Sequence, residues 1–143
     1  MEKNAIFKEI VNDDRFLKEK EFIQHGSTSV YEHSIYVATT CVKIARKFNI
    51  KVDENALIKG ALLHDYFLYD WHIDDKTHRL HGFTHAKRAM KNANHDFKLN
   101  DIEKNMILTH MFPMNLRIPK YKESIILCIS DKIVATKETF KRK

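Results

Sequence analysis

The chain has 143 residues, of which 43% are apolar, and 25 Lys and Arg stand against 19 Asp and Glu. This length and composition predict one globular domain, residues 1–143, and exclude a disordered or fibrous chain. With only 3 glycines and 2 prolines, the chain lacks the frequent turns of a β-sandwich, so we expect an all-α fold. It contains no membrane-length apolar run and no signal-peptide pattern, so we expect a cytoplasmic protein without membrane contact.

The net charge of +6 raises the question of a nucleic-acid partner. Half of that excess lies in a basic C-terminal tail, residues 137–143, which holds four basic residues and one acidic residue. Elsewhere basic and acidic residues alternate, and no segment resembles a recognition helix rich in exposed Arg and Lys. We therefore do not expect a nucleic-acid partner, and the charge pattern indicates no particular oligomeric state.

Helical periodicity predicts about five main helices after a weaker N-terminal extension over residues 1–24. The extension holds short helices from Asn4 to Val11 and from Asp14 to Phe22, and a break at 25–27 follows. The first main helix spans Ser29 to Phe48, with Ser29 as its N-cap and Glu32 as the capping-box partner. Its apolar stripe comprises Val30, Val37, Cys41, Ile44 and Phe48. Asp53 caps the second helix, whose stripe comprises Leu57, Ala61 and Leu68.

A polar, His-rich loop from Tyr69 to Gly82 follows, and it is longer than a compact domain usually contains without a functional reason. Thr84 starts a short helix that reaches Ala93. Asn100 or Asp101 caps the next helix, which Pro113 stops and which carries Ile102, Met106 and His110 at intervals of four. The last helix runs from about Lys122 to Thr136, with Leu127, Cys128, Val134 and Ala135 facing inward.

The two cysteines, Cys41 and Cys128, both fall within apolar helical patterns and have no CxxC spacing. We expect them to be small core residues rather than a disulfide or a thiolate zinc site.

Several polar residues occupy positions where the periodicity predicts core. His33, His64, His110 and Asp131 each lie inward on a different helix, and Asp65 adds a second carboxylate. A lone His on an apolar face is more often a hydrogen-bonded core residue, and a lone Asp is more often a cap or an ion-pair partner. A buried carboxylate must nevertheless be neutralised, hydrogen-bonded, paired or bound to a metal. Because no Lys or Arg shares these stripes, the set together favours a divalent metal site.

The order of these residues resembles the HD-domain superfamily of metal-dependent phosphohydrolases, whose pattern is H…HD…D on an all-α helical bundle. The matching segments are VYEHS, LLHDY and ISDKI, and the resemblance spans roughly residues 29–136. It implies that the core metal ligands are His33, His64, Asp65 and Asp131.

Two further histidines, His85 in THAKRA and His110 in ILTHMF, lie between the HD pair and the distal Asp. The resemblance is greatest to two-metal branches, the diadenosine tetraphosphatase-like and cyclic-dinucleotide phosphodiesterase-like groups, and implies a second metal with Asp65 as the bridge. Ala86 stands where those members have Pro, and His81 is the alternative to His85. The cofactor would be one or two divalent transition metals, Fe, Mn, Co, Ni or Zn.

The chemistry implied is hydrolysis of a phosphoester or phosphoanhydride by a metal-activated hydroxide, with nearby cations offsetting the developing charge. Asp65 would bridge and orient, and Lys132 would contact a phosphate unless it is merely solvated or ion-paired. Further candidate substrate contacts are His25, Lys76, Arg79 and His81, whereas His72, His78 and His95 are expected on the surface.

An aromatic cluster follows the HD pair: Tyr66, Phe67, Tyr69 and Trp71. Packing is its expected role, but one ring stacked on a nucleobase would favour a small nucleotide-type substrate. The alternative function is a catalytically silent HD module that binds a nucleotide or a metal as a sensor. The intact ligand set favours the enzyme.

Overall fold

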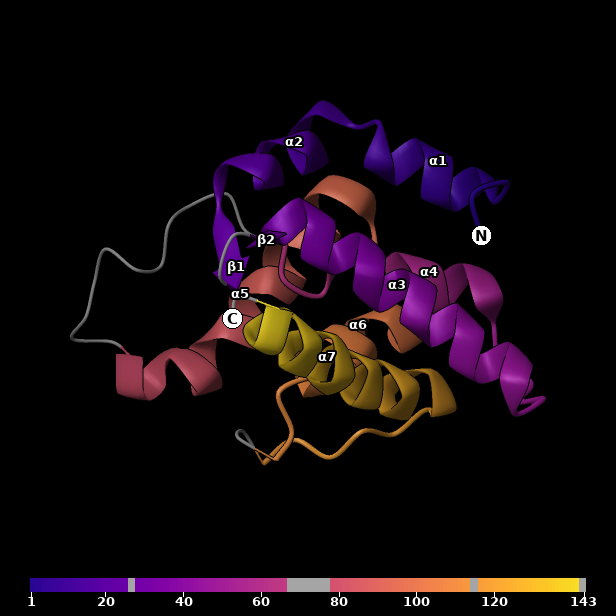
Figure 1. Cartoon of the computed structure of the whole chain (residues 1–143). Helices are drawn as coiled ribbons and strands as arrows, with labels where there is room; N and C mark the ends of the chain where they lie inside the picture. The colour runs from indigo at the N-terminus through magenta and orange to yellow at the C-terminus, as the bar shows by residue number, and fades with distance from the viewer. Residues whose placement is uncertain (26–27, 67–77, 114–115, 142–143) are drawn as a thin grey trace.

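A computed structural model describes residues 1–25, 28–66, 78–113 and 116–141, with the side chains of 23–25, 78–85 and 141 left out of the description. Within these residues the fold is all-α with one small hairpin (Figure 1). The N-terminal part comprises α1 (Ala5–Val11), α2 (Asp14–Leu17), the 3-10 helix η1 (Lys18–Glu21) and an antiparallel pair, β1 (Ile23–His25) with β2 (Thr28–Ser29). The five main helices are α3 (Val30–Lys47), α4 (Glu54–Leu63), α5 (His78–Phe97), α6 (Asp101–Thr109) and α7 (Lys122–Lys141).

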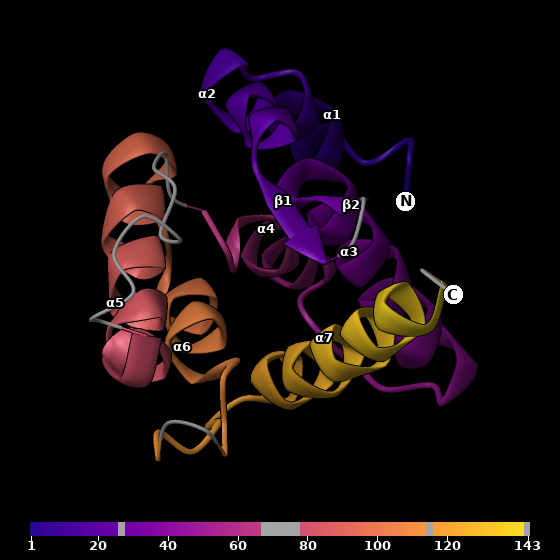
Figure 2. The same cartoon turned by 60° about the vertical axis from the view of Figure 1, so that its left-hand side comes forward.

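The main helices surround one core. Helix α3 packs against α4 and α7, and α6 packs against both α4 and α7. Helix α5 lies beside α6 at the edge of the bundle, and α1 packs on α4 (Figure 2). The buried stripes of α3, α4 and α7 meet in a core that includes Val37, Leu57, Leu62 and Leu127. The expected all-α bundle with five main helices is thus confirmed.

Local sequence signals set several helix starts. The Ser29 hydroxyl accepts from the Glu32 N–H and the Glu32 carboxylate returns to the Ser29 backbone, so the predicted capping box is present. Asp53 caps α4, and Asn100 rather than Asp101 caps α6. At the other end of α3, the αL conformation of Asn49, with φ of 55°, turns the chain.

A close approach of α4 and α6 positions the site. A Cβ on Gly60 would lie 2.5 Å from Sδ of Met106, so a glycine lets the two helices pack closely there. The C-terminal ends of α4 and α6 carry His64 and His110 as their C-cap residues. The two imidazole rings lie edge to face, with centroids 4.9 Å apart.

Several predicted boundaries were wrong. Helix α4 ends at Leu63 and does not continue to Leu68, and α7 continues five residues beyond Thr136. Helix α5 begins at His78 and ends at Phe97, because a single Gly82 costs a helix only about 1 kcal/mol and does not end it. The helix predicted from Asp14 to Phe22 is instead α2 followed by the 3-10 helix η1, and the paired strands β1 and β2 lie on either side of residues 26–27.

Two stripe positions also differ from the prediction. Phe48 is 64% exposed instead of inward, because it is the C-cap of α3 where the chain turns away. Ala135 is only half-buried. Both cysteines are buried and free, as predicted. In the described part of the chain, no helix is both long and apolar enough to span a membrane.

Candidate metal centre

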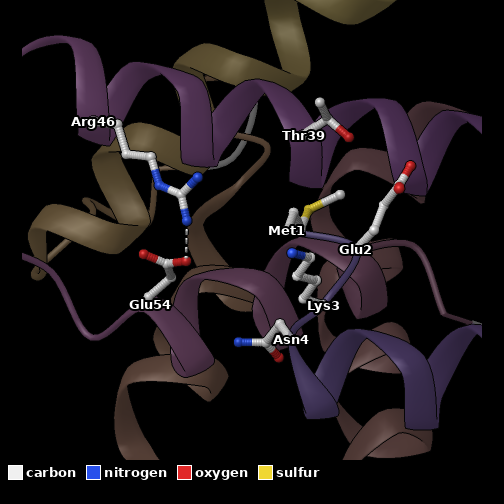
Figure 3. Close-up of a pocket in the computed structure, with 7 residues that line it drawn as sticks. All are labelled: Met1, Glu2, Lys3, Asn4, Thr39, Arg46 and Glu54. Carbon is white, nitrogen blue, oxygen red and sulfur yellow. Dashed lines mark hydrogen bonds and ion pairs between the residues drawn. The ribbon is translucent and has the colours of Figure 1, made fainter.

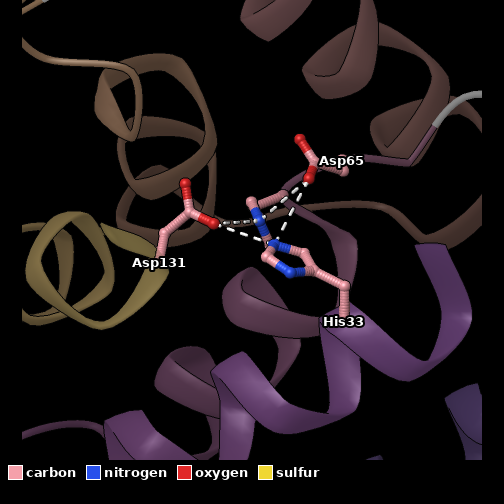
Figure 4. A group of neighbouring side chains, drawn as sticks. His33, Asp65 and Asp131 are labelled. Atoms are coloured by element: carbon pink, nitrogen blue, oxygen red, sulfur yellow. Dashed lines mark hydrogen bonds and ion pairs between the residues drawn. The ribbon is translucent and has the colours of Figure 1, made fainter. Parts of the chain in front are cut away.

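Four side chains from three helical segments meet in the interior. His33 comes from α3, His64 and Asp65 from the end of α4, and Asp131 from the middle of α7. One ligand atom of each lies within 4.8 Å of the others. Figure 4 shows His33, Asp65 and Asp131 pointing toward one another from these separate segments. The predicted H…HD…D set is therefore brought together by the fold.

The distances suit a small cation. Oδ1 of Asp131 lies 2.9 Å from Nε2 of His33 and 3.3 Å from Nε2 of His64. Oδ2 of Asp65 lies 3.1 Å from Nε2 of His64 and 3.8 Å from Nε2 of His33. Ligand bonds of about 2.1 Å in tetrahedral arrangement separate neighbouring donor atoms by about 3.4 Å. The observed separations bracket that value, so the donor set fits a divalent metal.

Both imidazoles are held by their second nitrogen. Nδ1 of His33 lies 2.8 Å from Oε1 of Glu138, and Nδ1 of His64 lies 2.6 Å from the carbonyl oxygen of Ala61. Such contacts fix the tautomer and leave Nε2 as the metal-facing atom, and a carboxylate partner also makes the imidazole a stronger ligand. Glu138 was missed from the sequence, where it lies in the basic tail. Glu138 lies two helical turns after Asp131, and this spacing could have indicated that both residues lie on the same face of the helix.

The electrostatics point the same way. Burial lowers the pKa of His33, but hydrogen bonds to Asp131 and Glu138 outweigh it and raise that pKa to about 9. Burial also opposes protonation of His64, yet Asp65 and Asp131 hold its pKa well above the usual range. Burial raises the pKa of Asp131, but His64 and His33 together lower it below its ordinary value. The carboxylates thus favour a positive charge between them, which a metal ion supplies.

His110 lies beside this four-residue cluster. It is 1% exposed, and its Nε2 lies 3.4 Å from Oδ1 of Asp65. Its Nδ1 lies 2.6 Å from the carbonyl oxygen of Ile107, three residues earlier, as Nδ1 of His64 does with Ala61. The two oxygens of Asp65 therefore face different histidines, which is the arrangement that a bridging carboxylate requires.

Lys132 is exposed next to Asp131. Its Nζ lies 3.0 Å from Sγ of Cys128 and 3.5 Å from the carbonyl oxygen of His110. Tyr66 is fully buried and donates a 2.6 Å hydrogen bond to Oδ2 of Asp96, in keeping with the packing role expected for it. The His95 side chain is 87% exposed, as predicted.

Other predicted site residues fall outside what is described. Only backbone is described for a group that includes one β1 residue and several residues of α5: His25, His78, Arg79, His81 and His85. Arg79 and His81 lie on helix α5 instead of in the predicted loop. The segment 67–77 lies outside the described residues, and with it Lys76, His72 and the aromatic residues Phe67, Tyr69 and Trp71.

A surface pocket of about 650 Å³ lies between the N-terminus and the helices α3 and α4 (Figure 3). It contains the exposed ion pair of Arg46 and Glu54, whose side chains meet at 2.8 Å. It shares no residue with the His and Asp cluster. The buried cluster, and not this pocket, is therefore the candidate metal centre.

Comparison with protein families matches the HD domain over residues 30–136, a segment that holds all four clustered side chains. Neither curated proteins nor solved structures gave a match. The matched segment is most of the chain, and the fold is the all-α bundle expected of the family. The chain therefore belongs to the HD-domain family.

Proposed function

We propose that this HD domain is a metal-dependent phosphohydrolase that cleaves a phosphoester or phosphoanhydride of a small, nucleotide-type substrate. The observation that carries the proposal is the convergence of two Nε2 atoms and two carboxylate oxygens on one point, with both Nδ1 atoms already engaged. Such a donor set has the composition and spacing of a divalent transition-metal site. A metal bound there supplies Lewis acidity and an activated water for hydrolysis at neutral pH.

The chain's own residues define the open side of the centre. The Asp131 side chain is 20% exposed, whereas that of Asp65 is 4% exposed and those of His33 and His64 are fully buried. A phosphate therefore approaches from the side of α7.

Lys132 follows Asp131 on α7, and its Nζ lies 3.5 Å from the carbonyl oxygen of His110. Its partners among the described residues are a thiol and two carbonyl oxygens, all of them neutral. Its positive charge is consequently available to phosphate oxygens, with which a Lys ammonium forms charge-assisted hydrogen bonds.

We further propose a second metal ion, held by Asp65, His110 and His85. The opposite orientation of the two Asp65 oxygens supports the bridge, and the burial of His110 beside it supports the second ligand. This arrangement is similar to the diadenosine tetraphosphatase-like and cyclic-dinucleotide phosphodiesterase-like branches. We also propose that residues 1–143 form one domain, whereas a cytoplasmic location stays a prediction from the sequence.

The test combines metal analysis of protein purified without added metal with a screen for phosphatase and phosphodiesterase activity in Mn²⁺, Fe²⁺, Co²⁺ and Ni²⁺. We expect stoichiometric metal and hydrolysis of at least one substrate. The Asp65→Ala variant should lose both while its circular dichroism stays helical. Metal without hydrolysis would favour the silent sensor module, and an Asp65→Ala variant with normal hydrolysis would refute the assigned site.

A further inference from the structure

The last part of the chain concentrates the exposed apolar side chains of the molecule. Eight large apolar side chains are exposed in the described part of the chain, and six of these lie between residues 116 and 140: Leu116, Ile118, Ile125, Ile129, Ile133 and Phe140. Helix α7 packs against α3, α4 and α6, and it lies at the outside of the bundle (Figure 1 and Figure 2). Exposed apolar residues that gather in one place, instead of scattering singly, mark an interaction surface.

The exposed apolar residues of α7 form a row on one face of the helix. Ile125, Ile129 and Ile133 follow one another at intervals of four residues, and at about 100° per residue they lie within about 80° of one another around the helix axis. They are 48%, 49% and 37% exposed, so each is half sunk between its neighbours. Phe140 falls on the same face. Such a row is a ridge, the unit with which one helix packs into the groove of another.

The exposed charges around this row are all basic. Between residues 116 and 140 the exposed charged side chains are Arg117, Lys120, Lys122, Lys132 and Lys137. At about 100° per residue, Lys132 and Lys137 flank the row on opposite sides. The acids of α7 face inward, because Glu123 and Glu138 are buried and Asp131 belongs to the metal cluster. Basic and acidic residues that alternate along the sequence are thus separated by folding, and the outer face of α7 is positive.

Shape and charge together select what covers this face. A second copy of the chain fits poorly, because pairing α7 with α7 brings lysine against lysine. An anionic membrane surface takes broad apolar faces, whereas the row on α7 is one residue wide. A helix with its own apolar stripe seats against such a row, and Asp or Glu on both flanks of that stripe meets the lysines.

We propose that the outer face of α7 docks an amphipathic helix of a partner protein whose apolar stripe is flanked by acidic residues. The row from Ile125 to Phe140 is about 22 Å long, so the partner helix has about four turns. Lys122 and Lys137 lie near the two ends of the row and set the charge that the partner must carry. None of these residues belongs to the metal cluster, so docking does not require a bound metal.

The experiment uses the whole chain, with synthetic helical peptides of about 18 residues as probes. One peptide carries a Leu stripe flanked by Glu, a second carries the same stripe flanked by Lys, and a third is the first with its sequence scrambled. Fluorescence anisotropy measures each affinity, and backbone amide shifts in NMR locate the bound peptide. We expect the Glu-flanked peptide to bind about tenfold or more tightly than the other two, with the shifts on residues 122–140.

Variants at exposed positions test the row and the charges separately. Ile129→Glu should weaken binding of the Glu-flanked peptide about tenfold or more. The matched control is Phe48→Glu, since Phe48 is 64% exposed at the C-cap of α3 and lies outside this face. Lys137→Gln should weaken binding less and reduce its dependence on salt. Circular dichroism should stay helical in all three. On wild type, raising the ionic strength from about 0.01 to about 0.15 M shortens the Debye length from about 30 to about 8 Å and should weaken binding several-fold.

The other occupants give different results. Wild-type chain that sediments as a dimer, and that Ile129→Glu but not Phe48→Glu makes monomeric, would overturn the proposal in favour of a second copy. Binding to vesicles of phosphatidylserine and phosphatidylcholine that Ile129→Glu abolishes would overturn it in favour of a membrane surface. Equal affinities for the Glu-flanked and scrambled peptides, or amide shifts outside residues 122–140, would also overturn it.

Discussion

The contact between Glu138 and His33 predicts a specific loss of metal affinity on mutation. Glu138→Gln replaces the carboxylate that lies 2.8 Å from Nδ1 of His33 with a neutral amide of the same shape. Both side chains are buried, 0% exposed for His33 and 5% for Glu138, so water does not replace the lost charge. The imidazole keeps an acceptor for its N–H but becomes a weaker metal ligand.

The magnitude follows from the burial of the pair. Removing an outer-shell partner of this kind weakens metal binding about 10- to 100-fold, or about 1.4 to 2.7 kcal/mol. In the metal-free protein, a hydrogen bond to a charged group also becomes a hydrogen bond to a neutral amide, which costs about 1 kcal/mol. With an unfolding entropy of about 0.3 kcal/mol/K for a chain of this length, that cost lowers the melting temperature by roughly 3 °C.

Glu123→Gln is the matched control, since Glu123 is the other buried glutamate of α7 and accepts from the backbone N–H of Asp53 at 2.8 Å. Chelator competition gives the metal affinity, and thermal unfolding in chelator gives the stability. We expect both variants to lose stability but only Glu138→Gln to lose metal affinity. Equal metal affinities in Glu138→Gln, Glu123→Gln and wild type would refute the role assigned to Glu138.

The remaining predictions concern metal stoichiometry and pH. His110→Ala should halve the number of metal ions bound per chain, as measured by elemental analysis, whereas the control variant His95→Ala, at an exposed residue, should leave it unchanged. If His110→Ala also left the metal content unchanged, the centre would be mononuclear. The pKa of His33 rises from 6.5 to about 9 on folding, so its contribution to the metal-free fold is complete below pH 6.5 and is lost as pH rises to 9. That loss is about 3 kcal/mol at most, visible in urea unfolding with chelator present. Metal affinity should rise between pH 6.5 and 9, because His33 must lose its proton to bind a metal. A metal affinity that falls, or a metal-free stability that rises, over this pH range would contradict the prediction.

The features that the sequence predicted well are those decided within one turn or along one helical stripe. Ser29, Asp53 and Asn100 cap their helices because the hydrogen bonds involved span three residues. His33 and Asp131 were found because polar residues interrupt apolar stripes, and a buried polar group must have a partner. To predict that the two side chains meet, it was sufficient to assume that these stripes face one core.

The features that the sequence missed depend on contacts between distant segments. Glu138 and Glu19 both lie in charge-rich stretches, where the local pattern predicts solvent exposure. Glu138 is buried because α7 continues past Thr136 along α3, and its partner His33 lies 105 residues away. Glu19 is buried because η1 folds back onto α3. No periodicity within four alternating charges indicates which of them a distant helix will cover.

The HD pair shows how a correct residue assignment came from an incomplete structural argument. The sequence placed His64 and Asp65 inside a helix, where neighbouring side chains diverge by about 100° and only one of them readily faces the core. In the structure α4 ends at Leu63, and the end of the helix resolves this conflict. His64 caps the helix by holding the Ala61 carbonyl, and Asp65 follows in backbone that is free of the helical constraint. His110 makes the same kind of contact at the end of α6, where its Nδ1 meets the Ile107 carbonyl oxygen. Helix ends thus supply side chains directed at one point, with each imidazole oriented by its own backbone, so the geometry of the centre depends on how α4 and α6 pack at Gly60.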